Sequence, residues 1–275
     1  MTIPREQMLG IASHEREALG RTIQYTDPSA WDVDSRLPGW RNRDIVAHLA
    51  ASEAVTAAAL GSEPATEIET FLADGDGELT LERFNDWTVQ KRADAPFRAV
   101  VAEWGQNANA MLERAAAIPK EEWATRRVAW VAGEIPARFL LQSRVMEWWV
   151  HGEDIRAGAD LEPRREHWPI YCTNDLAIRT LPWALGLAGL HFDGRSVEFT
   201  LDGSGSGTWH YGLSPRELPP EDKAPDAVVE GRGDRFALVA ARRVPADVFV
   251  GDGTLVLSGD VDLAVTVLRH IRAFA

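Results

Sequence analysis

Glu147 and His151 are the residues of this chain whose types and spacing most directly suggest chemistry. If the segment around them is helical, they lie on one face of the helix, one turn apart. A carboxylate and an imidazole so placed can bind one divalent metal ion, because zinc commonly takes oxygen and nitrogen ligands. Catalytic zinc sites use three protein ligands and leave a fourth position open, so a third ligand must come from another helix.

His48 is the best candidate for the third ligand. It stands between Ala47 and Leu49 in a segment whose apolar residues recur every three or four positions, a pattern that predicts a helix. Such a histidine is expected to face inward, and metal sites in helix bundles are built from inward residues on facing helices. Two alternatives stay open at this point. The pair Glu147 and His151 could decorate a solvated face, and His48 could be an ordinary core residue.

The residues around the pair strengthen the case for a metal, although both alternatives stay open. Trp148, Trp149 and Val150 make the segment unusually apolar. A carboxylate and a histidine that are buried in such a helix need partners, and a metal ion would supply them.

Two charged neighbours are candidates for orienting the ligands. Asp154, three residues after His151, could accept the second ring N–H of that histidine and fix its tautomer. Arg144, three residues before Glu147, could orient the carboxylate. The alternatives are a surface acid near the helix end and an ion pair on the helix surface.

Four long helices are expected to position these residues, and they occupy the first 160 residues of the chain. Apolar periodicity, caps and prolines predict them at 4–24, 42–59, 80–117 and 136–158, with a break in the third at 94–96. Their order and connections suggest an up-down bundle. The acidic segment 61–77 is expected to be a solvated loop.

Residues 161–275 follow a different pattern and are expected to form a smaller α+β domain. Helices are predicted at 166–187, 234–243 and 260–274, and strands at 196–201, 207–211, 227–230 and 254–258. The fold class of the whole chain is therefore α+β, with an N-terminal four-helix bundle over residues 1–160 followed by this domain.

The composition excludes several classes of protein. The 275 residues carry a net charge of −13, whereas a nucleic-acid binder needs a basic face, so we expect no nucleic-acid partner. No apolar stretch approaches the length of a membrane span, and the chain does not open with a signal peptide. We therefore expect a cytoplasmic protein without a membrane partner, and the single cysteine, Cys172, also suits a reducing compartment.

Two parts of the chain resemble the ligand helices of the DinB-like, or YfiT-like, metalloprotein superfamily. The first comprises residues 37–40 (LPGW) and 43–49 (RDIVAHL), and the second is 144–155 (RVMEWWVHGEDI). More narrowly, the chain resembles mycothiol-dependent proteins of the maleylpyruvate isomerase family. That group has a glutamate where many relatives have the first of two histidines, as Glu147 is here. The resemblance spans the whole chain and is strongest over these two parts.

The resemblance implies a zinc ion, or another divalent metal, held by His48, Glu147 and His151. It also implies that the thiol of mycothiol, as cofactor or co-substrate, occupies the open position, where the metal stabilises the nucleophilic thiolate. An isomerase would add this thiolate to a cis double bond, allow rotation, and eliminate it to give the trans product. An S-transferase would leave the sulfur attached to a small electrophilic substrate. We further expect a monomer or a homodimer.

The resemblance also implies an arginine of the second domain near the active site. Arg242 occupies the matching place, with Arg243 beside it as the alternative. An arginine fork suits a substrate carboxylate. Arg242 and Asp154 therefore join the three metal ligands as candidate site residues.

Two other functions stay open at this point. The chain could be a non-catalytic module that binds metal or thiol, or a DinB-like metalloenzyme that uses a different thiol. Cys172 has no basic neighbour that would activate its thiol, so it is expected to be structural. The reacting sulfur would then come with the cofactor.

Overall fold

The computed structural model of the chain describes residues 3–74, 79–130, 133–214 and 223–273. The chain divides into two compact units, Met1–Pro163 and Arg164–Ala275. The first consists of helices and one small hairpin, and the second of a four-stranded sheet with helices. The chain is therefore α+β, as the sequence predicts.

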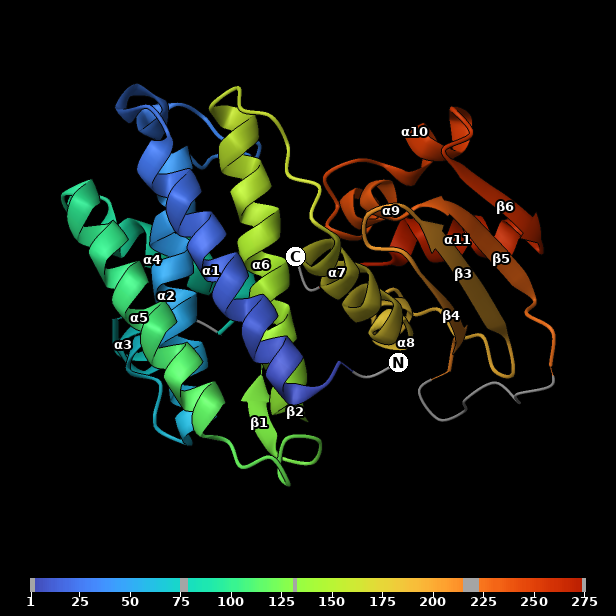
Figure 1. Ribbon diagram of the computed structural model, residues 1–275, viewed down its shortest axis with the longest axis horizontal. Coiled ribbons are helices and arrows are strands. Elements are labelled where there is room, and N and C mark those ends of the chain that lie inside the picture. Colours follow the sequence, from blue (N-terminus) through green and yellow to red (C-terminus); the bar gives the residue numbers. More distant parts are fainter. Residues whose placement is uncertain (1–2, 75–78, 131–132, 215–222, 274–275) are drawn as a thin grey trace. The chain divides into compact units, whose positions relative to one another are not determined.

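Four long helices make up most of the first unit (Figure 1). They are α1 (Arg5–Tyr25), α2 (Asn42–Gly61), α5 (Phe97–Ala117) and α6 (Ala137–Gly158). Helix α1 packs against α6, and α2 packs against both α5 and α6, so their apolar faces meet in one core. A short 3₁₀ helix (Pro28–Asp32) follows α1, and a hairpin of β1 (Arg127–Trp130) and β2 (Gly133–Pro136) precedes α6.

Two shorter helices, α3 (Thr66–Asp74) and α4 (Leu81–Arg92), pack against α2. The predicted break at 94–96 is confirmed, because α4 ends before it and α5 begins after it. The prediction of a loop over 61–77 is wrong for residues 66–74, which form the helix α3. Residues 75–77 lie outside the described part of the chain. The reason is Phe71, whose buried ring contacts Phe84 and Trp87 of α4 at centroid distances of 5.7 and 5.6 Å. One apolar face was enough to fold the segment in spite of its acids.

Helix α6 is central to the bundle. Nearly every residue from Leu140 to Ile155 is buried, which agrees with the apolar sequence around Trp148 and Trp149. A helix that is buried on all sides has little water to solvate its charges, so its polar side chains need partners inside the protein.

The second unit is built on a sheet with the strand order β4-β3-β5-β6. The strands are β3 (Ser196–Asp202), β4 (Gly207–Gly212), β5 (Ala227–Arg232) and β6 (Leu255–Gly259). Strand β3 pairs antiparallel with β4 and parallel with β5, and β5 pairs antiparallel with β6. Val197, Phe199 and Leu201 form the buried face of β3, and the helices α9 (Gly233–Ala240) and α11 (Val261–His270) pack against the sheet.

The predicted helices 234–243 and 260–274 end earlier in the structure, at Ala240 and His270, and residue 274 lies outside the described part of the chain. Two larger differences from prediction also occur in the helices of the second unit. The helix predicted at 166–187 is two helices, α7 (His167–Arg179) and α8 (Leu181–Leu187). Pro182 lies at the start of α8, where a missing N–H is tolerated, but it cannot continue α7. The short helix α10 (Ala246–Gly251) after Pro245 was not predicted, because its six residues are too few for a periodic pattern.

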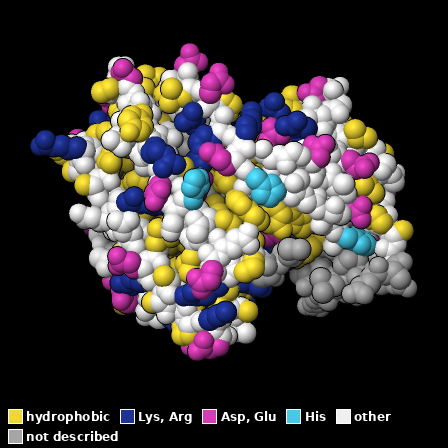
Figure 2. All heavy atoms as spheres, viewed as in Figure 1, with side chains coloured by type: hydrophobic (Ala, Val, Ile, Leu, Met, Phe, Trp, Pro, Cys, Tyr) yellow, Lys and Arg dark blue, Asp and Glu magenta, His cyan; other side chains and the backbone are white. Residues whose placement is uncertain are grey.

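Two features of the structure are relevant to the membrane and nucleic-acid partners that the sequence analysis considered. Among the described residues, no helix combines the length and the apolar character that crossing a membrane requires. On the face of the first unit drawn in Figure 2, acidic and basic side chains are interspersed. That distribution is typical of an ordinary solvated surface.

The start of α2 touches the end of α6. A Cβ atom on Gly158 would lie 2.6 Å from Oδ1 and 2.7 Å from Nδ2 of Asn42. Asn42 is fully buried, and its Nδ2 donates to the carbonyl of Ala30 at 2.9 Å. Because that side chain has nowhere to move, glycine at 158 sets how closely the two helices approach at this end.

Replacing Gly158 with alanine is expected to destabilise the protein by about 1–3 kcal/mol, the usual cost of overpacking a rigid site. The matched control is Gly10→Ala in α1, where an added Cβ meets nothing within 4 Å. There the better helix propensity of alanine should stabilise the protein by about 0.5–1 kcal/mol. Urea unfolding measures both changes. Equal changes at the two positions would contradict the close packing of Gly158 on Asn42.

Candidate metal centre

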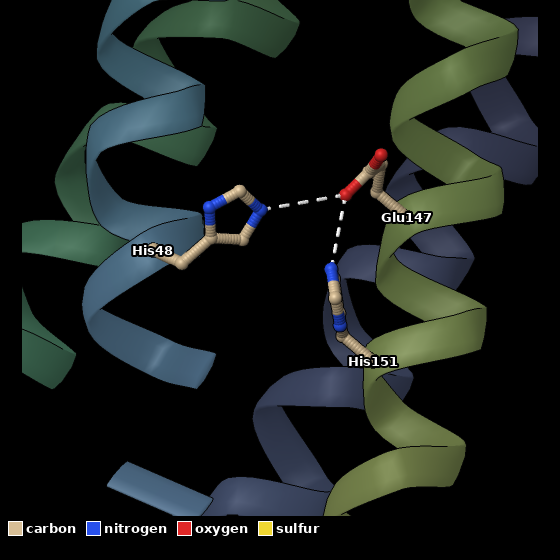
Figure 3. A group of neighbouring side chains, drawn as sticks. All are labelled: His48, Glu147 and His151. Carbon is tan, nitrogen blue, oxygen red and sulfur yellow. Dashed lines mark ion pairs between the residues drawn. The ribbon is translucent and has the colours of Figure 1, made fainter. Parts of the chain in front are cut away.

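His48 on α2 and the pair Glu147 and His151 on α6 point toward one another inside the bundle (Figure 3). Oε2 of Glu147 lies 3.1 Å from Nε2 of His151 and 3.6 Å from Nε2 of His48. One ligand atom from each residue can be chosen so that all three lie within 4.8 Å of one another. Both histidines are buried, and the side chain of Glu147 is 12% exposed.

The spacing of these atoms fits a divalent metal ion. Two ligand atoms bound at about 2.0–2.1 Å and separated by the tetrahedral angle lie about 3.3 Å apart. The two distances at Glu147 bracket that value. Two imidazole nitrogens and one carboxylate oxygen are a ligand set that zinc accepts, with a fourth position left for another molecule.

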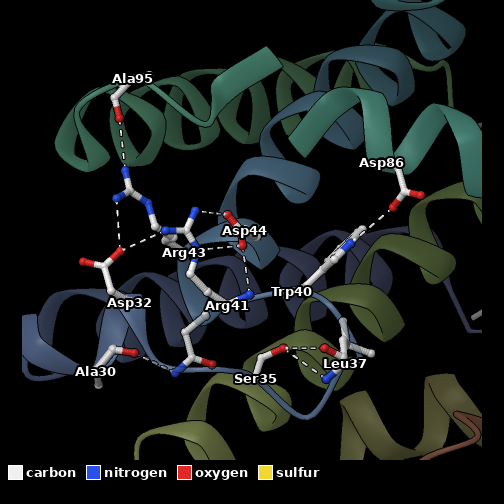
Figure 4. Close-up of polar contacts among 11 residues, drawn as sticks. Ala30, Asp32, Ser35, Leu37, Trp40, Arg41, Arg43, Asp44, Asp86 and Ala95 are labelled. Atoms are coloured by element: carbon white, nitrogen blue, oxygen red, sulfur yellow. Dashed lines mark hydrogen bonds and ion pairs between the residues drawn. The ribbon is translucent and has the colours of Figure 1, made fainter. Parts of the chain in front are cut away.

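The segment before α2 is held by its own polar contacts (Figure 4). Asp44 accepts hydrogen bonds from the backbone N–H of Arg41 at 2.9 Å and from its guanidinium at 3.0 Å. This carboxylate caps the positive end of the helix. Arg43 donates to Asp32 and to the carbonyl of Ala95, which ties the start of α2 to the residues just before α5.

Trp40, from the same segment, lies against the ligand on α2. Its ring centroid is 5.3 Å from that of His48, with the ring planes at 48°. Its indole N–H donates to Oδ1 of Asp86 on α4 at 3.3 Å (Figure 4). Trp40 belongs to the LPGW motif, but it is not among the predicted site residues, because its contact with Asp86 joins residues 46 apart in the chain.

Two of the three candidate ligands, Glu147 and His48, are in the charge state that metal binding requires. Burial opposes a charge on Glu147, yet the neighbouring rings of His151 and His48 and the positive field of Arg144 hold its pKa well below the usual value. Burial lowers the pKa of His48. Glu147 is thus an anion and His48 a neutral imidazole, the forms in which these side chains bind a metal.

Asp154 lies directly behind His151. Its Oδ2 is 3.2 Å from Nδ1 of that histidine, and the carboxylate is fully buried, so the alternative of a surface acid is wrong. Although burial opposes a charge on His151, the hydrogen bonds with Asp154 and Glu147 raise its pKa. A proton on Nδ1, donated to Asp154, would leave Nε2 free as the ligand atom.

Arg144 has a different partner from the one its spacing suggests. Its guanidinium forms a buried ion pair with Glu53 of α2, and the indole of Trp148 donates to the same carboxylate. The interpretation as an ion pair on the helix surface is therefore wrong. Sequence reasoning missed Glu53, although a single acid within the apolar run from Ile45 to Leu60 was a signal for it.

Arg242 lies in the second unit, directly after α9, with an exposed side chain and a left-handed backbone at φ 58°. Arg243 beside it is less exposed and donates to the carbonyl of Ala241 at 2.7 Å. The three candidate ligands belong to the first unit. The role of Arg242 at the site stays a prediction.

Replacing Asp154 with asparagine is expected to weaken metal binding about 10- to 100-fold, because the carboxylate that fixes the ring of His151 is lost. The same change should lower the pKa of His151, since the hydrogen bond with Asp154 favours the imidazolium. Competition with a chelator measures the first effect, and NMR titration of the metal-free protein the second. Glu113→Gln, which neutralises an exposed acid of α5, is the control and should leave both unchanged. An unaltered pKa of His151 in the Asp154 variant would contradict this assignment.

Comparison with known proteins identifies the family. Residues 12–156, more than half of the chain, match the model of the mycothiol maleylpyruvate isomerase N-terminal domain. Crystal structures of the mycothiol-dependent maleylpyruvate isomerase and of a histidine-to-alanine mutant share the fold, each with a TM-score of 0.60. Each alignment covers 94% of this chain and 96% of the other, at 18% and 17% identity respectively. The curated proteins contain no significant match. The chain therefore belongs to the family of the mycothiol maleylpyruvate isomerase N-terminal domain.

Proposed function

We propose that the chain is a mycothiol-dependent isomerase of the maleylpyruvate type, with a divalent metal ion, zinc by preference, at His48, Glu147 and His151. The main support is the convergence of two imidazole nitrogens and one carboxylate oxygen within the segment that matches the family. The names of the family and of the two solved relatives point to mycothiol as the thiol. The partner would be a small electrophile, and the single cysteine suits a cytoplasmic protein.

The reacting sulfur has to come from outside the chain. The one cysteine, Cys172, is fully buried in α7, where a substrate cannot reach its thiol. Bound at the three ligands, a divalent cation supplies the positive charge that keeps an incoming thiol in its nucleophilic thiolate form at neutral pH.

The chain's own residues hold the ligands in one arrangement and one ionic state. Glu147 stays a carboxylate, and Asp154 holds the ring of His151 from behind. Trp40 packs against the ring of His48. Because these contacts exist before a substrate arrives, little reorganisation is needed when the thiol binds.

Isomerisation needs the thiolate only for part of the cycle. Addition to an activated cis double bond forms a C–S bond and leaves a C–C single bond, about which the substrate can rotate. Elimination then breaks the C–S bond, restores the double bond as trans and returns the thiolate, so no other reactant is consumed. If the substrate instead carries a leaving group, the thiolate displaces that group and the sulfur stays bonded to the product. A thiol S-transferase is therefore the second candidate, because the ligand set activates the thiol in either reaction.

Purified protein is expected to contain about one zinc ion per chain. His48→Ala should lose the metal, because only two ligands remain. His14→Ala is the matched control, since it removes an exposed histidine of α1 and should keep the metal. Metal analysis after gel filtration gives the occupancy of each variant. Full zinc occupancy in His48→Ala would refute the ligand set.

The metal-loaded protein is expected to accelerate the cis–trans isomerisation of maleylpyruvate only when mycothiol is present, which absorbance measurements can follow. Other low-molecular-weight thiols in place of mycothiol test whether the thiol is specific. A stable thiol adduct with a generic electrophile, detected by mass spectrometry, would favour the S-transferase. Tight binding of mycothiol without acceleration of either reaction would contradict an enzymatic function. The remaining interpretation would then be a non-catalytic binding module.

A further inference from the structure

A second cluster of buried charges lies on the two helices that carry the ligands. Nη2 and Nε of Arg144 donate to Oε1 and Oε2 of Glu53, at 2.8 and 3.1 Å. Nε1 of Trp148 donates to Oε1 of the same carboxylate at 2.7 Å. The side chains of Arg144 and Glu53 are 1% and 0% exposed, so water does not solvate this ion pair.

Arg144 has a second carboxylate within reach of its positive field, that of Glu147. The two residues are three apart on α6, a spacing at which helix side chains can pair. Nevertheless, the guanidinium faces Glu53, and Oε2 of Glu147 faces the two histidines (Figure 3).

It matters that Glu53, and not Glu147, pairs with Arg144. Arginine cannot lose its charge in a protein, so a buried guanidinium needs an anion beside it. If Glu53 were neutral, Glu147 would be the remaining carboxylate whose field acts on Arg144. An ion pair between them would draw the Glu147 oxygen away from the histidines. The centre would then lose its only anionic ligand.

We propose that Glu53 is a positioning residue of the metal centre. By occupying the fork of Arg144, it keeps the carboxylate of Glu147 turned toward His48 and His151. Arg144 can then exert its positive field on Glu147 without competing for it. This inference rests on the proposed function, because it assigns Glu53 a role only if the three residues bind a metal.

The test separates this role from that of an ordinary structural ion pair. Glu53→Gln keeps the shape of the side chain and removes its charge, whereas Glu53→Gln/Arg144→Met removes both charges. Competition of Co²⁺ with a chelator measures the affinity of the folded protein. Glu53→Gln should bind at least about 10-fold more weakly. The double variant should recover most of this loss, because no unpaired cation competes for Glu147.

The visible absorption of bound Co²⁺ gives a second measurement that a purely structural role would not change. Loss of the Glu147 oxygen alters the coordination of the ion and should change the spectrum of Glu53→Gln, and the double variant should restore it. Glu103→Gln is the matched control. It removes one of the two carboxylates that pair with Arg92, another buried arginine of the bundle, and should leave affinity and spectrum unchanged.

The outcomes distinguish the two proposals. Wild-type protein that binds no metal would contradict the proposed function itself. Normal binding by the wild type and equally strong binding by Glu53→Gln would overturn only the role of Glu53. An equal loss in the single and double variants would also overturn it, because the ion pair would then act on the fold. If Glu53→Gln does not fold, the double variant Glu53→Gln/Arg144→Met, which leaves neither charge unpaired, is compared with the wild type alone. It should keep most of the Co²⁺ affinity and the spectrum, and a large loss of affinity in the folded double variant would overturn the role of Glu53.

Discussion

Charges buried between α2 and α6 are the constraint on which the rest of the bundle depends. The side chains of Arg144, Glu53 and Asp154 are at most 1% exposed, and an unpaired charge at that depth costs several kcal/mol. Each therefore needs an opposite charge, a hydrogen-bond partner or a metal ion. Glu53 meets Arg144, and Asp154 meets His151. This pairing leaves the carboxylate of Glu147 facing the two histidines.

These buried charges can pair only if α2 is held in a fixed position against α6, and several contacts of the bundle hold it there. Gly158 lets Asn42 approach at one end of the pair of helices, and Asp44 caps the start of α2. Trp40 fills the space beside the ring of His48 and is itself held by Asp86. Under the proposed function these contacts belong to the site, because ligand positions must hold to within about 0.5 Å for a metal centre to work.

The part of the site that could be predicted from the sequence depends on short-range helix geometry. Glu147, His151 and Asp154 lie on one helix, so spacings of four and three residues decide which of them meet. Residues that meet between two helices are not separated by a fixed number of positions in the sequence, so spacing cannot predict such contacts. Glu53 and Arg144 are 91 residues apart, and their meeting depends on how α2 packs on α6. Helix α3 escaped prediction for a related reason: the buried ring of Phe71 outweighs the acids that dominate the composition of the segment.

Under the proposed function, the choice of ligands also sets the charge of the centre. Two neutral imidazoles and one carboxylate bring one negative charge to a divalent cation, which leaves one positive charge for a thiolate to cancel. The ion pair of Glu53 and Arg144 adds no net charge, whereas the buried carboxylate of Asp154 behind His151 adds one negative charge. A histidine in place of Glu147 would hold the thiolate more tightly, and a sulfur so stabilised is a weaker nucleophile. A second carboxylate among the ligands would weaken the field that keeps the thiol deprotonated. One anionic ligand therefore balances formation of the thiolate against its reactivity, which is why the orientation of Glu147 matters more than that of a charge elsewhere in the bundle.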